Sequence, residues 1–281
     1  MITSRLNFDL TRSNTFAMPV VCRNFVEYDK AEDLPAILNE LPDDEPVMHI
    51  GSGSNLLFTR DYPGTVLHSR IRDIELTECG DDSVIVKAGA GVVMDDLISD
   101  LCTDQYWGLE NLSGIPGEVG ASAVQNVGAY GCEAADAIVS VGVYDRKDKK
   151  FRQLDVNECA YAYRDSIFKH SPAKERFIIT DVTYILSEAY SPNLKYRALA
   201  EMFPEDPPVS PLAVRRAVID IRDSKLPDPT KVPSAGSFFK NPEIEQALFE
   251  KIAAEEGGKD NVPHYLLADG RVKIPAAWLI D

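Results

Sequence analysis

Apolar residues recur along the chain with two periods, one typical of helices and one of strands. In residues 31–41, Leu34, Ile37, Leu38 and Leu41 fall on one helical face. The same spacing predicts helices at 93–104, at 210–224 and from the Asn241-Pro242 pair to about residue 256. Short β-branched runs predict strands at 46–50, 65–71, 74–79, 83–91, 137–146, 150–154 and 176–186. Because the strands come in runs, the pattern favours the α+β class over a doubly wound sheet.

The two ends of the chain give weaker signals. The opening residues read as a polar segment, and the first apolar run is Val20-Val21.

The helix at 210–224 begins with Ser210 as its N-cap and Pro211 in its first turn. The prolines of residues 225–230 end that helix and indicate a domain boundary. A short helix is predicted to begin at Pro275, and it needs packing to be stable because so few residues remain.

Residues 107–131, WGLENLSGIPGEVGASAVQNVGAYG, carry six of the seventeen glycines and no lysine or arginine. Glycine lets a ligand approach the main chain closely, and exposed N–H groups can hold phosphates without basic side chains. The alternative is a glycine-rich surface loop. Residues 51–55, Gly-Ser-Gly-Ser-Asn, follow a predicted buried strand and offer a second phosphate cradle. They match neither the dinucleotide fingerprint, since Leu56 replaces a glycine, nor a P-loop.

Composition narrows the possible functions. The chain has 281 residues with 29 basic and 45 acidic side chains, a net charge of −16 that opposes binding to nucleic acid or anionic membranes. The five cysteines and four histidines show no disulfide framework and no metal-ligand spacing, so no metal is expected. With no apolar signal core at the N-terminus, we expect a cytoplasmic protein.

A third candidate segment is residues 161–169, YAYRDSIFK. Its Arg164 lies beside tyrosines, an aspartate and a lysine, and a guanidinium can hold a carboxylate or an enolate through two hydrogen bonds. The alternative is a surface turn in which Arg164 pairs with Asp165.

Together these segments resemble the type I UDP-N-acetylenolpyruvoylglucosamine reductases. Seven motifs occur in the family's order, at residues 14–16 (NTF), 51–55 (GSGSN), 108–117 (GLENL with IPG), 125–131 (QNVGAYG), 163–169 (YRDSIFK), 225–229 (KLPDP) and 236–242 (GSFFKNP). The resemblance implies a vanillyl-alcohol-oxidase-type FAD-binding fold of two subdomains, residues 1–68 and 69–224. A partial substrate-binding domain, residues 225–281, would follow.

The resemblance also implies the reaction and the site. NADPH would reduce a non-covalently bound FAD, which would pass hydride to C3 of UDP-N-acetylglucosamine enolpyruvate, giving UDP-N-acetylmuramate for peptidoglycan synthesis. Arg164 would stabilise the enolate and Ser237 would donate the proton to C2. Substrate would be bound by Tyr163, Tyr196, Lys225 and Asn241. FAD would be bound by Gly51, Ser52, Gly53, Ser54, Asn55, Ile115, Pro116, Gly117, Gly120, Ser122, Gln125, Asn126, Gly128, Tyr130, Gly131 and Arg222.

The sequence departs from the family at its end. Family members continue past the segment that matches 278–281, and that tail carries a catalytic glutamate for which this sequence has no match. We therefore expect a fragment of a longer reductase that binds FAD weakly or not at all and is badly impaired in turnover. The alternatives are a flavin oxidase on the same fold, which the reductase motif at 236–242 disfavours, and a non-catalytic flavin- or nucleotide-sugar-binding chain. A monomer with small-molecule ligands, and no nucleic-acid or membrane partner, is expected.

Overall fold

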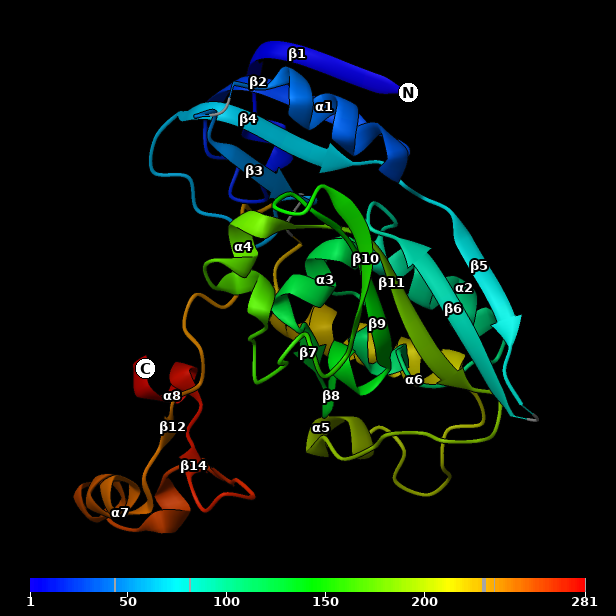
Figure 1. Cartoon of the computed structure of the whole chain (residues 1–281). Helices are drawn as coiled ribbons and strands as arrows, with labels where there is room; N and C mark the ends of the chain where they lie inside the picture. Colours follow the sequence, from blue (N-terminus) through cyan, green and yellow to red (C-terminus); the bar gives the residue numbers. More distant parts are fainter. Residues whose placement is uncertain (43, 81, 229–230, 235, 281) are drawn as a thin grey trace. The chain divides into compact units, whose positions relative to one another are not determined.

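The computed structural model describes residues 1–42, 44–80, 82–228, 231–234 and 236–280, which form two compact units, Met1–Ala235 and Gly236–Asp281. The first unit begins with a four-stranded sheet in the order β1-β2-β4-β3 (Figure 1). Strand β1 pairs antiparallel with β2, whereas β2 and β3 both pair parallel with β4. The strands are β1 (Ile2–Asp9), β2 (Val21–Tyr28), β3 (Val47–Ile50) and β4 (Tyr62–Ser69).

A helix packs on this sheet, as the spacing of the apolar residues predicts. The helical segment consists of the 3-10 turn Ala31–Asp33 and α1 (Leu34–Glu40). Leu34 and Ile37 are buried in one cluster with Val26 and Leu67 of the sheet. Tyr144 of the second sheet belongs to the same cluster, so the two sheets share a core at this point.

The second sheet has five antiparallel strands in the order β10-β9-β11-β6-β5. Its central strand, β11, comes last in the chain and lies between β9 and β6. The pairing of β11 with β9 shifts register between Ile179 and Asp181 and again between Thr183 and Tyr184. The strands are β5 (Ile74–Glu78), β6 (Ser83–Gly89), β9 (Ile138–Asp145), β10 (Lys150–Asp155) and β11 (Phe177–Ser187).

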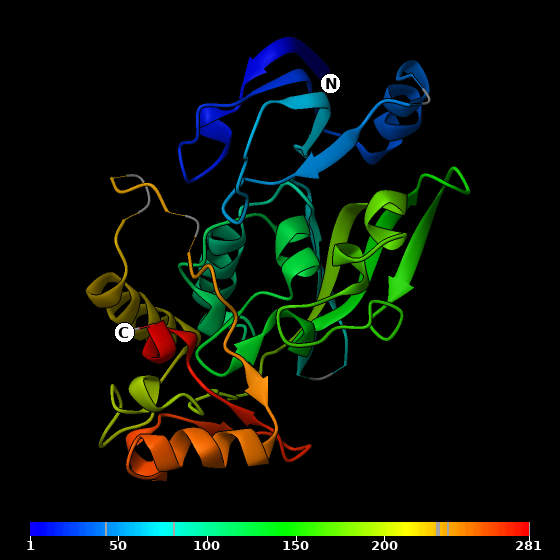
Figure 2. The ribbon, with the colours of Figure 1, turned by 90° about the vertical axis from the view of Figure 1, so that its left-hand side faces the viewer.

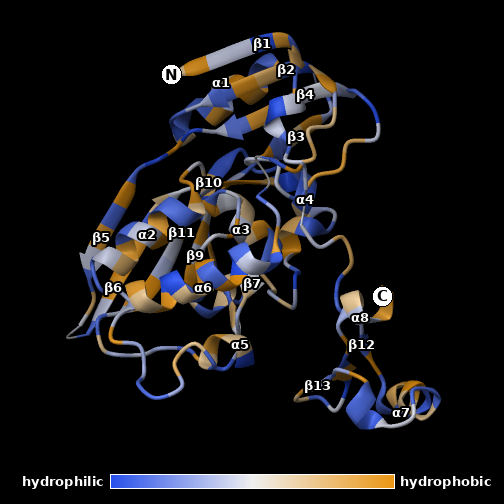
Figure 3. Cartoon of the chain, turned by 180° about the vertical axis from the view of Figure 1, so that it is seen from behind, coloured by the Kyte–Doolittle hydropathy of each residue, from blue (hydrophilic) through white to orange (hydrophobic). Residues whose placement is uncertain are grey.

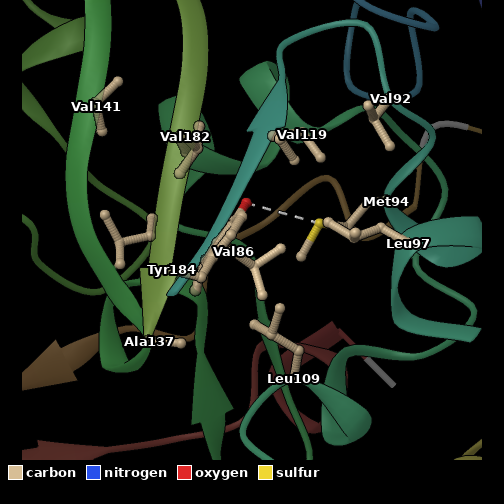
Figure 4. Packing of buried hydrophobic residues seen from close by; sticks show 14 of the residues in the cluster. Val86, Val92, Met94, Leu97, Leu109, Val119, Ala137, Val141, Val182 and Tyr184 are labelled. Carbon is tan, nitrogen blue, oxygen red and sulfur yellow. Dashed lines mark hydrogen bonds between the residues drawn. The ribbon is translucent and has the colours of Figure 1, made fainter. Parts of the chain in front are cut away.

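Two helices, α2 (Met94–Thr103) and α3 (Val119–Gln125), cover one face of this sheet and bury its largest core cluster. Figure 4 shows Tyr184 of β11 among Val86, Val182 and Met94, with its hydroxyl 3.9 Å from the Met94 sulfur. Figure 3 shows polar and apolar residues side by side along α2, as expected of a helix with one buried face. The long helix α6 (Pro211–Lys225) packs against α2.

Short elements connect these layers in the first unit. The 3-10 turns are Thr11–Ser13, Glu110–Leu112, Ala134–Asp136 and Ile167–Lys169. The remaining elements are the two-stranded hairpin β7 (Gly128–Ala129) and β8 (Cys132–Glu133), with α4 (Ala173–Arg176) and α5 (Arg197–Ala200).

The second unit contains a small three-stranded sheet and two helices (Figure 2). Its core consists of Phe249 and Ala253 of α7 packed against Val262, Val272 and Ile274. The elements are β12 (Glu243–Ile244), α7 (Gln246–Glu255), the 3-10 turn Lys259–Asn261, β13 (Tyr265–Leu266), β14 (Val272–Lys273) and α8 (Ala276–Ile280).

Most predicted elements are confirmed, and two predictions are wrong. Residues 2–9 form a strand, although they read as a polar segment, because β1 is an exposed edge strand whose order comes from pairing with β2. The helix predicted from Asn241-Pro242 begins only at Gln246, since residues 243–244 pair with β14. The N-cap prediction for Ser210 is confirmed, because its hydroxyl accepts a hydrogen bond from the Ala213 N–H at 3.2 Å. Within the described ranges, the structure holds no helix with the length and apolar character needed to cross a membrane.

Candidate functional site

The two glycine segments that the sequence singles out lie against each other in the first unit. Segment 51–55 follows β3, and segment 115–118 leads into α3. The Ser54 hydroxyl donates to the Pro116 carbonyl at 3.0 Å, and the Ser52 hydroxyl donates to Glu118 Oε1 at 3.1 Å. A Cβ added to Gly51 would lie 3.1 Å from Glu118 Oε2, so glycine permits this close approach. We call these two segments the glycine cradle.

The glycine cradle offers donors that suit a phosphate ligand. Gly53 has φ +69°, and a Cβ there would collide with the Ser13 carbonyl. Among the described residues, the N–H groups of 52–55 donate no hydrogen bond. The Thr15 hydroxyl is also buried without a partner in this part of the chain, and the Thr15 N–H donates to the Gly53 carbonyl at 3.3 Å. Free N–H groups and a hydroxyl fit the pyrophosphate of FAD without basic side chains.

Not all the predicted cofactor residues face outward. Gly120 packs on β6 and its turn, where an added Cβ would lie 2.9 Å from the Ala90 Cβ. The N–H of Gly120 donates to the Ala90 carbonyl at 3.0 Å. The Ser122 hydroxyl donates to the Val119 carbonyl at 2.7 Å, inside the core. Ile115 is partly buried against the same core cluster. These three residues therefore have packing roles that support the cradle from behind.

The end of α3 is fixed by two further predicted residues. Asn126 is left-handed, with φ +42°, and is fully enclosed. Its side-chain amide donates to Glu133 Oε2 at 2.8 Å and to the Ala162 carbonyl at 2.9 Å. Gln125 Oε1 accepts from Lys169 Nζ at 3.1 Å. Asn126 thus joins the end of α3 to the β7–β8 hairpin and to the segment before Tyr163.

The β7–β8 hairpin turns at two predicted residues, Tyr130 and Gly131, with φ +51° and +82°. The Tyr130 ring meets the Tyr196 ring edge to face, with centroids 5.1 Å apart. Burial raises the pKa of Tyr130, and the neighbouring Arg222 guanidinium offsets part of that rise. Asn111 joins the two tyrosine segments, because its amide donates to the Tyr130 carbonyl at 2.7 Å and to the Asn193 carbonyl at 2.8 Å.

The hairpin also holds Arg164. Arg164 has φ +53°, and its guanidinium donates to the carbonyls of Gly128 and Asn126 and forms an ion pair with Glu133 at 3.3 Å. Its own carbonyl accepts from Lys169 Nζ at 2.7 Å. The guanidinium carbon lies 5.1 Å from the centre of the Tyr163 ring. Arg164 therefore pairs with Glu133 of the hairpin. Among the described residues it forms no ion pair with its sequence neighbour Asp165, which instead contacts His170.

The remaining predicted residues lie on α6 and in the second unit. Arg222 passes close to Gly114, where an added Cβ would lie 3.0 Å from Arg222 Nε. Lys225 is exposed at the end of α6. In the second unit, Ser237 is exposed, and Asn241 Oδ1 accepts from the Ala276 N–H at 2.9 Å. Asn241 thus caps the start of α8.

Three residues of this region were missed by the sequence reasoning. Glu118 directly follows Gly117 of the cradle, and its position was a usable signal for a role there. His68 of β4 contacts Glu118, with Nε2 2.9 Å from Oε1, a partnership between residues far apart in the chain. Glu133 follows the QNVGAYG motif and pairs with Arg164. The last two contacts depend on tertiary structure and leave no pattern in the sequence.

Comparisons with known proteins agree with this geometry. A family model described as an FAD binding domain matches residues 23–152. A UDP-N-acetylenolpyruvoylglucosamine reductase of Bacteroides fragilis is 45% identical over 275 residues, which cover 98% of this chain and 81% of the relative. The Chromobacterium violaceum protein of the same name is 43% identical over 282 residues, covering 99% of this chain and 81% of the relative.

Solved structures show the same fold. The crystal structure of the UDP-N-acetylenolpyruvylglucosamine reductase of Thermus caldophilus matches with a TM-score of 0.63 at 23% identity, covering 98% of this chain and 88% of that one. A BBE-like 1 variant of Physcomitrella patens matches with a TM-score of 0.51 at 13% identity, covering 68% and 43%. The predicted α+β FAD-binding fold is confirmed by these likenesses.

Proposed function

This chain belongs to the UDP-N-acetylenolpyruvoylglucosamine reductase family, and we propose that it carries out that family's reaction with FAD and NADPH. The reaction reduces UDP-N-acetylglucosamine enolpyruvate to UDP-N-acetylmuramate, a precursor of peptidoglycan. The observation that carries the proposal is the glycine cradle, whose free N–H groups lie within the FAD-binding region. FAD, bound without a covalent link, supplies hydride transfer from NADPH to C3 of the enolpyruvyl group.

The residues of the first unit would bind the cofactor and hold the substrate. The N–H groups of 52–55 and the Thr15 hydroxyl bind the cofactor's pyrophosphate. Arg164 holds the substrate carboxylate, where negative charge grows as hydride arrives, and its fixed position spares reorganisation in the transition state. Tyr163 and Tyr196 contact the substrate beside it.

The proton for C2 would come from Ser237, and Lys225 and Asn241 would bind the substrate's diphosphate or carboxylate. A serine hydroxyl is a weak acid, so Ser237 needs neighbours that stabilise its alkoxide, and Lys240 is nearby in sequence. The Asn241 Oδ1 atom accepts a hydrogen bond from the Ala276 N–H. The Asn241 side-chain NH2 group is therefore the one that would donate to the substrate.

We keep three functional parts, 1–68, 69–224 and 225–281, and a cytoplasmic monomer as parts of the proposal. The first boundary falls at the end of β4, between the two sheets of the first unit. The partner is the small-molecule substrate, since the acidic charge opposes nucleic acid and anionic lipid.

A visible spectrum of the purified protein with excess FAD, followed by anaerobic NADPH, tests the proposal. Flavin absorbance that co-purifies with the protein and bleaches on reduction is the expected result. Oxidation of NADPH that depends on the enolpyruvyl substrate then separates a reductase from a non-catalytic flavin-binding chain. Absence of flavin binding would refute the proposal.

A further inference from the structure

A carboxylate lies inside the glycine cradle, where an anionic ligand is proposed to bind. The Glu118 side chain is only 7% exposed. Its Oε1 accepts from the Ser52 hydroxyl, and its Oε2 faces the Cα of Gly51. The Glu118 carboxylate would repel a pyrophosphate bound at segment 51–55, because the screening by water is reduced in a buried site. The cradle therefore requires a compensating positive group next to Glu118.

His68 is placed to supply that group. Its side chain is 12% exposed, its Nε2 lies 2.9 Å from Glu118 Oε1, and its Nδ1 lies 3.3 Å from Glu27 Oε1. A carboxylate oxygen only accepts hydrogen bonds, so both contacts are hydrogen bonds only when both ring nitrogens carry protons.

Other charged groups lie around His68. Glu27 of β2 is also paired with Arg5 and lies 3.6 Å from Arg70, so it has cations of its own. Glu118 has no ion pair except that with His68 in the described part of the chain. His49 of β3 is nearby and hydrogen-bonded to Tyr28, and burial lowers its pKa to about 4, which leaves it neutral. Among the described residues, His68 is therefore the side chain placed to offset the charge of Glu118.

We propose that His68 and Glu118 are a positioning pair that holds segment 51–55 against segment 115–118 and keeps the cradle compatible with the cofactor's pyrophosphate. The inference rests on the proposed function, which puts the pyrophosphate in this cradle. Glu118 supplies the mechanical link through Ser52, and His68 cancels its charge. The pair acts through the cradle and not on the reacting atoms.

The proposal predicts an unusual order of FAD affinities. H68Q leaves Glu118 charged and uncompensated, so FAD affinity should fall by about tenfold or more. E118Q keeps an acceptor for Ser52 and removes the charge, so affinity should stay within about threefold of wild type. The double variant H68Q/E118Q should recover to within about threefold of wild type, because the uncompensated charge is gone.

The measurement is a titration of the apoprotein with FAD by flavin fluorescence, with the thermal unfolding midpoint of each apoprotein as a folding check. H170Q is the matched control, since His170 also contacts a carboxylate, Asp165 at 2.8 Å, but lies at the surface. It should bind FAD like wild type. If H68Q does not fold, E118D makes the same test, because it keeps the charge but shortens the reach to Ser52, and it should bind FAD more weakly than E118Q.

The outcomes separate this inference from the proposed function. Wild-type protein that takes up no FAD would refute both. Wild-type protein that binds FAD, with H68Q binding equally well, would refute the positioning pair alone. A double variant as weak as H68Q would also refute it, because a purely structural histidine gains nothing from neutralising Glu118.

Discussion

Arg215 of α6 and Asp95 of α2 form a two-point ion pair, with Nη1–Oδ1 and Nη2–Oδ2 distances of 2.5 and 2.9 Å. Asp95 Oδ1 also accepts from the Gly114 N–H at 2.6 Å. Burial favours a higher pKa for Asp95, but the hydrogen bonds from Arg215 and Gly114 outweigh it and hold the pKa below its usual range. One carboxylate thus fixes the helix that carries Arg222 and the loop that enters the glycine cradle.

The variant R215M should lower the free energy of unfolding by about 2 kcal/mol, because it leaves a half-buried carboxylate without its partner. The pKa of Asp95 is lower in the folded than in the unfolded protein, so the pair stabilises above the unfolded pKa. The difference between wild type and R215M should therefore shrink as the pH falls through the folded pKa. Urea denaturation at several pH values measures both effects.

The control for that prediction is R197M. Arg197 is also ion-paired, with Glu201, but its side chain is 91% exposed. Its loss should leave the free energy of unfolding close to that of wild type, because a fully exposed ion pair contributes little. Equal stability of R215M and wild type at neutral pH would contradict the prediction.

The variant G53A should lose FAD binding and stability together. Its Cβ would collide with the Ser13 carbonyl, and the residue must also adopt φ +69°. We expect FAD affinity to fall by at least about tenfold and stability by about 2 kcal/mol or more. The measurement is FAD titration with thermal unfolding.

Gly80 provides a matched control, since it has φ +79° but nothing within 4 Å of an added Cβ. G80A should cost only about 1 kcal/mol, from backbone strain alone, and leave FAD affinity unchanged. If G53A and G80A have equal stability and equal FAD affinity, the close approach of Gly53 to the Ser13 carbonyl is not important for the cradle.

The variant R164M should lower kcat/KM for the enolpyruvyl substrate by about 100- to 1,000-fold, because it removes a fixed positive group where charge develops. FAD affinity should fall by much less than kcat/KM, since the Arg164 guanidinium contacts the hairpin at Gly128 and Glu133 and not segment 51–55. Steady-state NADPH oxidation and FAD titration measure the two quantities. The exposed Arg72 supplies the control variant R72M, and a loss of FAD affinity in R164M that equals its loss of activity would rule out the assigned role.

His49 should make the protein less stable in mild acid. Burial lowers its pKa to about 4 in the folded protein, below the ordinary 6.5, so the unfolded chain binds a proton that the folded chain does not. Stability is full above pH 6.5 and falls as the pH is lowered towards 4. Because the side chain keeps some exposure, we expect a loss of about 2 kcal/mol over this window.

The variant H49N should remove the fall in the free energy of unfolding between pH 6.5 and pH 4. Urea denaturation at several pH values in this range measures it. H170N, at an exposed site, is the control and should keep the wild-type profile. A wild-type profile with no acid-side decline in this window would contradict the assignment.

The sequence predicts the fold class and the long elements well, because most of them have one buried face. Strand β1 was missed for the opposite reason: Ile2 and Leu6 are exposed, and the polar residues 3–5 separate them, so the strand has almost no buried face. The start of α7 was misplaced because Asn241 does cap a helix, but that helix is α8, which begins at Ala276. A capping residue carries no information about a partner that is distant in the chain.

Much of the glycine cradle could be predicted, because glycines at positive φ or at close approaches are visible as residue types. The helix that follows it, α3, was not predicted, since Gly120 and Ser122 are weaker helix formers than alanine and interrupt the pattern. Their small size instead lets α3 approach β6 closely, and this packing stabilises the helix. The contacts of His68 with Glu118 and of Arg164 with Glu133 were out of reach, because each joins distant segments through side chains.

The position of β11 has a consequence for how the chain can fold. Strands β6 and β9 are joined only through β11, which is the last of the five strands to be synthesised. A nascent chain that has not yet reached residue 187 therefore has the residues of the glycine cradle but not the sheet on which α3 rests. Such late, long-range strand pairing slows folding and leaves apolar edges open until it is complete. The cofactor site is thus finished by a strand that contributes none of its proposed ligand contacts.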